Sequence, residues 1–178
     1  MTFLPQRGYM KHVVYLFLAF SLVGCLSMPT VPPPTWNANS DASESEYTQY
    51  TTPGTATISG QAFLTQSGGG VVKAAGRNVT LDPATTIGNE WWGKAGKHWV
   101  HRSLIPPSPG FVKARRTVVA DADGRFKFTD LPAGKYFVRT EVTWEVGGYV
   151  PTQGGLVGQL IEVGNGKSRE VILNQYPE

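Results

Sequence analysis

The sequence has little cysteine, little charge and no long apolar run. Cys25 is the only cysteine among 178 residues, so no disulfide can form within the chain. Lys, Arg, Asp and Glu together make up 16% of the residues. The longest uncharged apolar stretch, residues 13–24, is shorter than the roughly 20 residues that a membrane-spanning helix needs. These absences argue against a disulfide-held scaffold and against a spanning helix, and we expect one domain folded around a hydrophobic core.

The motifs of the common hydrolases are also missing. The sequence contains no Gly-x-Ser-x-Gly elbow, no His-Glu-x-x-His pair and no second cysteine. His98 and His101 are spaced for one face of a helix, and Glu90 or Asp82 could be a third metal ligand, but no second cluster supports such a site. We therefore expect no enzyme activity, no metal and no cofactor apart from a covalent lipid.

Residues 1–24 have the features of an export signal. Arg7 and Lys11 precede the uncharged run, which has the length of a signal-peptide core. The run ends in Leu22, Val23, Gly24 and Cys25. This ending resembles a bacterial lipobox, and the resemblance implies a lipoprotein in which Cys25 is acylated, with palmitate or a similar chain, and becomes the new N-terminus. The alternative is that Cys25 is an ordinary apolar residue of a signal cleaved elsewhere.

Acylation of Cys25 would make membrane lipid the first partner of this protein. Several buried acyl chains anchor a protein far better than a single chain does. The next residue is Leu26 rather than Asp. In an organism with two membranes, the resemblance to sorted lipoproteins then implies delivery to the outer membrane, facing the periplasm. We predict a lipid-anchored protein of the cell envelope.

Residues 25–54 are predicted to be the lipidated cysteine and a disordered tether. After the cysteine the stretch is rich in Ser, Thr and Pro, has three acids and no Lys or Arg, and shows no apolar period. Such a composition offers too little apolar surface to offset the entropy of ordering the chain. Trp36, Tyr47 and Tyr50 are the exceptions, and could dock on the domain or on a partner.

Residues 55–178 are predicted to form an all-β domain. Gly (21) and Pro (13) are abundant, as in turn-rich β proteins. Alternating apolar residues predict seven strands, over residues 55–64, 77–81, 112–120, 125–128, 135–146, 157–163 and 170–173. In the longest alternation Arg139, Glu141 and Glu145 share one face, which we expect to meet water. Seven short strands separated by turns favour an antiparallel Greek-key sandwich.

One segment carries a distinctive motif, D-x-x-G-x-F-x-F-x-x-L-P-x-G-x-Y, and is expected to form a hairpin. Its residues are Asp121, Gly124, Phe126, Phe128, Leu131, Pro132, Gly134 and Tyr136. The motif resembles that of carboxypeptidase regulatory-like domains, which have a transthyretin-like fold, and the resemblance implies a non-catalytic structural or interaction module. Transthyretin-like enzymes that hydrolyse 5-hydroxyisourate end in Tyr-Arg-Gly-Ser, whereas this chain ends in Asn-Gln-Tyr-Pro-Glu.

A tryptophan-rich insert from Thr85 to Gly110 interrupts the strands, and we expect a short helix near residues 86–93. It contains Trp91, Trp92 and Trp99 with the cations Lys94, Lys97 and Arg102. Two interpretations stay open. The tryptophans cover one end of the sandwich as ordinary core, or they form with the cations a binding edge for sugar rings, an acidic glycan or an acidic protein.

These observations favour a structural or protein-interaction module that docks on another envelope protein. The alternative is a carbohydrate-binding module that takes cell-wall polysaccharide through the tryptophan-rich insert. Nucleic acid is not an expected partner, because removal of the signal leaves 14 Lys and Arg against 13 Asp and Glu.

Overall fold

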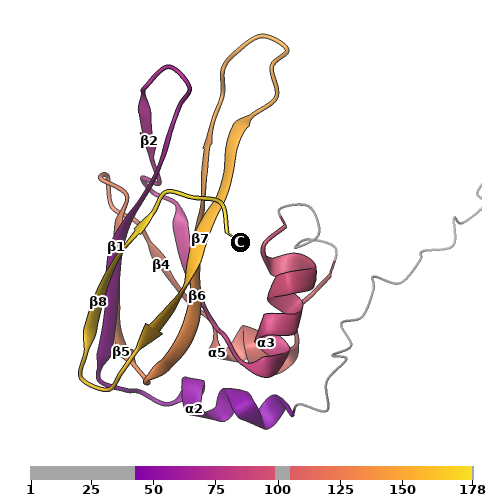
Figure 1. Cartoon of the computed structure of the whole chain (residues 1–178), viewed down its shortest axis with the longest axis vertical. Coiled ribbons are helices and arrows are strands. Elements are labelled where there is room, and N and C mark those ends of the chain that lie inside the picture. Colours follow the sequence, from indigo (N-terminus) through magenta and orange to yellow (C-terminus); the bar gives the residue numbers. More distant parts are fainter. Residues whose placement is uncertain (1–42, 99–104, 178) are drawn as a thin grey trace, which may run out of the picture. The chain divides into compact units, whose positions relative to one another are not determined.

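The structure of the protein, a computed structural model, describes residues 43–98 and 105–177. Two β-sheets face each other, and short helices lie at one end and beside one sheet (Figure 1). The predicted signal, the lipobox and most of the predicted tether fall outside the described residues, as do Trp36, Trp99, His101 and Arg102. Among the helices of the described part, none has the length and apolar character needed to cross a membrane.

The two sheets have four strands each in the described part of the chain. The first sheet contains β1 (Ala56–Thr65), β2 (Val71–Lys73), β5 (Arg125–Leu131) and β8 (Ser168–Leu173). The second has the order β4 (Arg116–Val119), β3 (Asn78–Pro83), β6 (Gly134–Trp144) and β7 (Gln153–Val163).

The predicted all-β sandwich is confirmed, with two differences in detail. The described residues form eight strands rather than seven, because the short β2 pairs with the end of β1. The strand β8 runs parallel to β1, whereas the other neighbouring strands are antiparallel.

The core lies between the sheets, where the period-2 alternation places it. Ile58 and Ala62 of β1 are fully buried, and so is Val79 of β3. Phe126 and Phe128 of β5 are buried with their ring centroids 6.1 Å apart in an edge-to-face arrangement. The core-facing residues expected for these strands are therefore confirmed.

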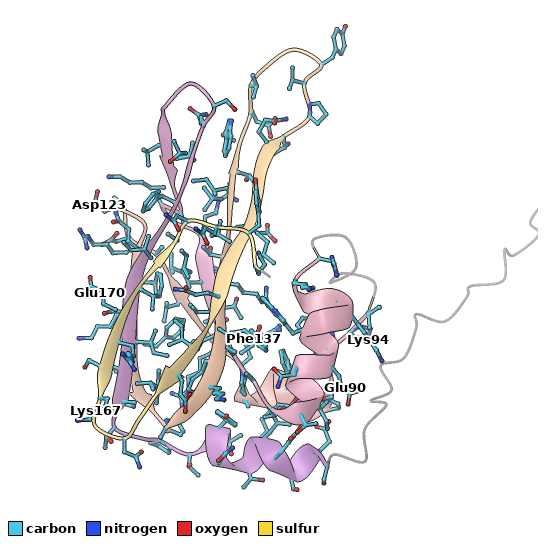
Figure 2. The ribbon with its side chains drawn as sticks, viewed as in Figure 1. Glu90, Lys94, Asp123, Phe137, Lys167 and Glu170 are labelled. Atoms are coloured by element: carbon cyan, nitrogen blue, oxygen red, sulfur yellow. The ribbon has the colours of Figure 1, made fainter. Side chains whose placement is uncertain are left out.

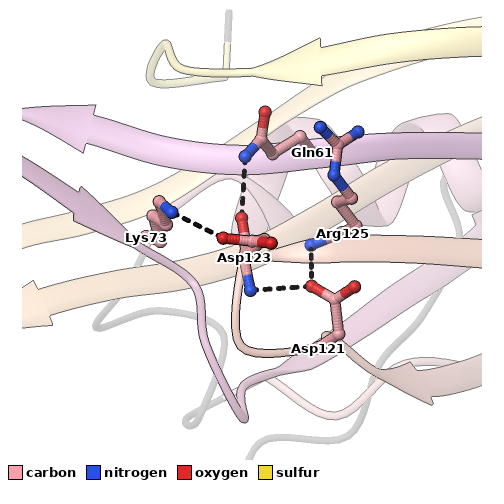
Figure 3. A network of polar contacts seen from close by, with 5 residues as sticks. All are labelled: Gln61, Lys73, Asp121, Asp123 and Arg125. Carbon is pink, nitrogen blue, oxygen red and sulfur yellow. Dashed lines mark hydrogen bonds and ion pairs between the residues drawn. The ribbon is translucent and has the colours of Figure 1, made fainter.

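The turn that begins the motif joins the two sheets and is not the expected hairpin. It leads from β4 in the second sheet to β5 in the first. One oxygen of Asp121 accepts hydrogen bonds from the backbone N–H groups of Asp123 and Arg125, both at 2.8 Å (Figure 3). Gly124 has a φ of 73°, which glycine adopts without strain. Local turn chemistry was predicted correctly, but it does not specify which strands pair.

Within this turn, Asp123 lies two residues before β5 and contacts residues of β1 and β2. Its carbonyl oxygen accepts a hydrogen bond from Gln61 Nε2 at 2.8 Å, and its carboxylate lies 2.6 Å from Lys73 Nζ (Figure 3). The hydrogen bond from Lys73 lowers the pKa of the Asp123 carboxyl below its usual value. Both side chains are exposed, so this ion pair contributes little to stability.

The second half of the motif builds a corner around a tyrosine from the N-terminal segment. Leu131 is fully buried, and Tyr136 donates a hydrogen bond from its hydroxyl to the carbonyl of Pro132 at 2.7 Å. A Cβ at Gly134 would lie 2.7 Å from the ring of Tyr50. The rings of Tyr50 and Tyr136 meet edge to face with centroids 5.3 Å apart. Glycine is therefore required at Gly134 because Tyr50 packs against the backbone there.

The end of the predicted tether is ordered on the domain. Residues of this part form η1 (Glu44–Tyr47) and α2 (Thr48–Thr51), and Tyr47 and Tyr50 are 2% and 5% exposed. The domain therefore begins before residue 55, because these two aromatic rings supply the apolar surface that the composition of the tether otherwise lacks. The docking that the sequence allowed for Tyr47 and Tyr50 is seen in the structure.

The insert forms α3 (Thr86–Trp91), the π-type turn η2 (Trp92–Gly96) and α5 (Pro109–Ala114). The helix α3 confirms the short helix expected near residues 86–93. The strand predicted over residues 112–120 is wrong at its start, which belongs to the helix α5. Ser108 is its N-cap, accepting from Phe111 N at 3.4 Å, and Pro109 occupies the first turn. A serine followed by proline is a helix-start signal that overrides the β-propensity of the next residues.

The buried tyrosines predict a loss of stability in alkali. Burial raises the pKa of Tyr47, Tyr50 and Tyr136 above 10.0, so the folded protein holds these phenol protons more tightly than the unfolded chain does. Their contribution is complete below about pH 10 and is lost as the pH rises through the raised pKa values. Thermal unfolding midpoints between about pH 8 and 11.5 should fall more gently in Tyr50→Phe than in the parent.

The matched control is Tyr149→Phe, because Tyr149 is fully exposed at the β6–β7 loop. This variant should follow the parent curve throughout. An equal alkaline decline in the parent and in Tyr50→Phe would contradict the linkage.

Candidate functional site

A buried carboxylate on the outer face of the second sheet organises the site. Asp82 of β3 is 0% exposed, and its two oxygens accept from Arg139 Nε at 2.9 Å and from Arg115 Nε at 2.5 Å. Arg139 itself is 7% exposed, so the prediction that this face of β6 meets water is wrong at Arg139, whereas Glu141 is half-buried and Glu145 is exposed as expected. The insert covers that face, and a carboxylate buried there is tolerated only when it is paired.

Arg115 connects this ion network to the aromatic residues of the insert. Its guanidinium carbon lies 5.2 Å from the ring centroid of Phe111 and 5.9 Å from that of Trp91, within the range of cation–π contacts. Trp91 is 1% exposed and donates a hydrogen bond from Nε1 to the carbonyl of Ile105 at 3.0 Å. The arginine therefore fixes the insert both by charge and by aromatic contact.

The second tryptophan attaches the insert to β6. Trp92 stacks on Phe137 with ring centroids 4.3 Å apart and an interplanar angle of 10°. Figure 2 shows Phe137 on the side of the sheet where the helices lie. Trp92 and Phe137 are each 5% exposed. Both described tryptophans of the insert are thus core residues, and the interpretation of Trp91 and Trp92 as exposed stacking platforms is wrong.

The other predicted binding residues are distributed differently. Lys94 of η2 is exposed (Figure 2), and Lys97 is half-buried. Trp99 and Arg102 lie outside the described residues. The insert therefore contributes its described aromatic rings to the floor of the site rather than to its surface.

Two carboxylates of η1, those of Glu44 and Glu46, bind the N-terminal ends of α3 and α5. Glu46 accepts hydrogen bonds from the backbone N–H groups of Thr86 and Ile87 at 3.0 and 2.7 Å, and Glu44 accepts from Gly110 N at 2.6 Å. These N–H groups belong to the first turns of α3 and α5, where they lack partners within the helix. Sequence reasoning missed both roles, because the acids lie about 40 and 66 residues away from the helices they cap.

A polar cleft of about 490 Å³ opens between the insert and the second sheet. We call it the arginine cleft. Trp91, Arg139 and Leu156 are buried in its wall, whereas Arg77 and Asn78 are exposed at its rim. Its charged lining residues are Arg77, Arg115, Arg139 and Glu141.

A second depression, of about 670 Å³, is lined by Trp92 together with residues of β6, β7, β8 and the C-terminal tail. We call it the amide groove. Trp92 and Phe137 are its buried aromatic residues, and the exposed polar residues are Gln159, Asn174 and Gln175. Its apolar side chains Leu160, Ile172 and Tyr176 are 54%, 57% and 62% exposed. The C-terminal tail forms one wall, held by a 3.2 Å hydrogen bond from Gly158 N to the Gln175 carbonyl.

The two depressions are neighbours on one β-ladder. Successive cross-strand pairs of β6 and β7 on this face are Phe137 with Leu160, Arg139 with Gly158, and Glu141 with Leu156. The first pair lines the amide groove, the last lines the arginine cleft, and the middle pair contributes one residue to each. Same-face pairs follow one another at about 7 Å. One elongated ligand could therefore contact both depressions.

The groups on this surface can make hydrogen bonds and apolar contacts with a ligand. Guanidinium groups, amides and aromatic rings donate hydrogen bonds and offer apolar faces. The described residues include no group of three or more His, Cys, Asp or Glu placed to hold a metal ion. The metal site considered for His98 has its second histidine outside the described residues.

Comparison with solved structures finds a similar protein that is matched over nearly its whole length. A Pseudomonas aeruginosa protein, described as a proposed carbohydrate-binding protein, superimposes with a TM-score of 0.64 and 27% sequence identity. The match covers 76% of this chain and 99% of that one. The two proteins thus share a β-sandwich fold over almost the whole of the other chain.

Two pilin subunits match more distantly. A minor pilin of Streptococcus agalactiae gives a TM-score of 0.36 at 12% identity, covering 69% of this chain and 44% of that one. The major pilin of Bacillus cereus gives 0.37 at 14% identity, covering 69% and 31%. No family model matches the sequence, and no curated protein matches it significantly.

The buried network predicts a large effect of Asp82 on stability. Asp82→Asn keeps the size of the side chain but leaves two guanidinium groups without their shared counter-charge. We expect the free energy of unfolding to fall by about 3 kcal/mol, the usual cost of removing one partner from a buried ion pair. Urea unfolding followed by tryptophan fluorescence measures it. Asp123→Asn, which breaks an exposed ion pair, is the control and should behave like the parent; equal effects of both substitutions would contradict the role assigned to Asp82.

Proposed function

We propose that the domain is a non-catalytic carbohydrate-binding module that takes its ligand on the outer face of the second sheet. The observation that carries this proposal is the amide groove. It is lined by an exposed aromatic residue, Tyr176, together with the amide residues Gln159 and Asn174. Sugar rings present apolar C–H faces and hydroxyl edges, so an aromatic face with neighbouring amides complements both.

The Pseudomonas aeruginosa protein supports the proposal. It is described as a proposed carbohydrate-binding protein, and its fold corresponds to this chain over nearly all of its own length. Because proteins of one fold can bind different ligands, the proposal depends mainly on the residues of the amide groove. The sequence alone favoured a protein-interaction module and placed the alternative carbohydrate site on the tryptophans of the insert. We propose instead that carbohydrate binds in the amide groove, which is lined by Trp92.

We further propose that the mature protein is a lipoprotein held in the cell envelope by acylated Cys25, with the outer membrane facing the periplasm as its place in a two-membrane organism. The described domain begins 18 residues after that cysteine, at residue 43. At about 3 Å per residue, this length allows a reach of roughly 50 Å from the lipid surface. An anchored module of this kind would tie envelope glycan to a membrane.

A second candidate function, docking on an envelope protein, rests on a different surface. The strand β4 forms one edge of the second sheet, and Val119 at its end is 65% exposed. An edge strand offers unpaired backbone groups to an incoming strand of another protein. This surface is distinct from both depressions, so the two functions can be separated by mutation.

The carbohydrate-binding proposal predicts measurable binding of oligosaccharides. The full lipidated chain, purified in detergent, would be titrated by calorimetry with cellohexaose, chitohexaose and fully methyl-esterified hexagalacturonate. We expect at least one of these neutral probes to bind, and Tyr176→Ala to weaken that binding about tenfold, as loss of an aromatic anchor does.

Tyr149→Ala serves as the matched control, because Tyr149 is an exposed aromatic residue on the β6–β7 loop and lines neither depression. It should bind like the parent. Absence of binding to all three probes and to unesterified hexagalacturonate would overturn the proposal, and equal losses in both variants would place the ligand elsewhere.

A further inference from the structure

We infer that the saccharide carries carboxylate groups and that the arginine cleft binds one of them. This inference rests on the proposed carbohydrate-binding function and names the chemical class of the ligand. It starts from the charges of the cleft. Among the described residues that line it, three have guanidinium groups, Arg77, Arg115 and Arg139, and one has a carboxylate, Glu141. The buried carboxylate of Asp82 pairs with Arg115 and Arg139, so these five described residues together have one positive charge in excess.

The excess charge fits a monoanion. Both oxygens of Asp82 are already engaged by the Nε atoms of Arg115 and Arg139, which fixes these guanidinium groups in place. One carboxylate entering the cleft would bring the charge of the site to zero. A phosphate dianion would leave a negative excess beside Glu141, so the balance favours a carboxylate.

Hydrogen-bond donors remain for such a group. Arg115 Nη2 is buried and has no hydrogen-bond partner among the described residues. An unsatisfied guanidinium nitrogen in a low-dielectric environment is costly, and a carboxylate beside it would supply the missing acceptor. The described residues at the cleft thus have one positive charge in excess and one buried guanidinium nitrogen without an acceptor.

Arg77 provides the accessible part of the site. It is exposed at the rim, and its Nη2 donates to Thr143 Oγ1 at 3.0 Å. That bond restrains the side chain above the outer face of β6, on which Arg139 and Glu141 also lie. A guanidinium has five N–H donors, so most of those of Arg77 remain available for a fork-like contact with a carboxylate.

The neighbouring groove explains why the anion should belong to a sugar. Arg139 lines the cleft, and its cross-strand partner Gly158 lines the amide groove. A Cβ at position 158 would lie 2.9 Å from Arg139 Cβ, so β7 has no room for a side chain at this point between the two depressions. A sugar unit in the groove would therefore have its neighbour, or a substituent of its own, at the arginines. A chain containing uronic acid has this arrangement of groups.

The test compares two ligands with the same sugar chain, one with free carboxylates and one in which methyl esters remove their charge. The full lipidated chain in detergent would be titrated with hexagalacturonate and with its full methyl ester, at about 50 and 500 mM salt. We expect the acid to bind about tenfold more tightly than the ester at low salt, and the advantage to shrink at high salt. Equal affinities would overturn the inference and leave the proposed function intact, whereas absence of binding to every probe would overturn both.

Variants locate the carboxylate. Arg77→Gln should lose most of the preference for the acid and keep its affinity for the ester, with an unchanged unfolding midpoint because Arg77 is exposed. Arg77→Lys should recover part of the preference, since it restores the charge without the fork. The matched control is Arg125→Gln, which removes an exposed arginine from β5 in the other sheet. A preference for the acid that survives Arg77→Gln would show that the arginine cleft is not the site.

Discussion

The rest of the structure depends on the pairing of one buried carboxylate, that of Asp82. It lies on the outer face of the second sheet, where an unpaired charge could not persist without water. Its partners come from separate parts of the chain: Arg139 lies on the neighbouring strand β6, and Arg115 directly follows α5. Because Arg115 also contacts the rings of Phe111 and Trp91, the single charge links strand, helix and aromatic cover. These contacts hold the insert over the second sheet, and residues of both line the arginine cleft.

The N-terminal segment completes this arrangement from the other side. Glu46 caps α3 and Glu44 caps α5, so the first described residues satisfy the free N–H groups of the two insert helices. Gly110 has no room for a side chain, because a Cβ there would meet the Glu44 carboxylate and the ring of Tyr47. The segment that composition identifies as a spacer is thus, in its last part, a structural element of the site. Any functional fragment of this protein has to include it.

Sequence reasoning located most strands and missed what covers them. Alternation at Ile58, Ala62 and similar residues identifies the core face of a strand, because the side-chain period is two. The same pattern cannot tell that the opposite face is also covered, which is why Arg139 was expected in water. Likewise the density of tryptophan marked the insert as important, but burial of Trp91 and Trp92 follows from contacts with β6 and α5 that lie far away in the sequence. The amide groove was missed for the same reason, since its residues come from β7, β8 and the tail.

A buried ion network is a costly way to attach an insert, and this cost bears on function. Apolar side chains of similar volume commonly give equal or greater stability than a buried ion pair. Stability alone therefore does not account for two arginines on Asp82 beneath an open cleft, when Trp92 on Phe137 already attaches the insert to the same face. The ion network is explained if Asp82 holds the guanidinium groups in fixed positions for an anion that binds at the rim of the cleft. Rigid donors lose little entropy on binding, and the carboxylate of Asp82 supplies that rigidity while leaving the Nη atoms of Arg115 outside its own hydrogen bonds.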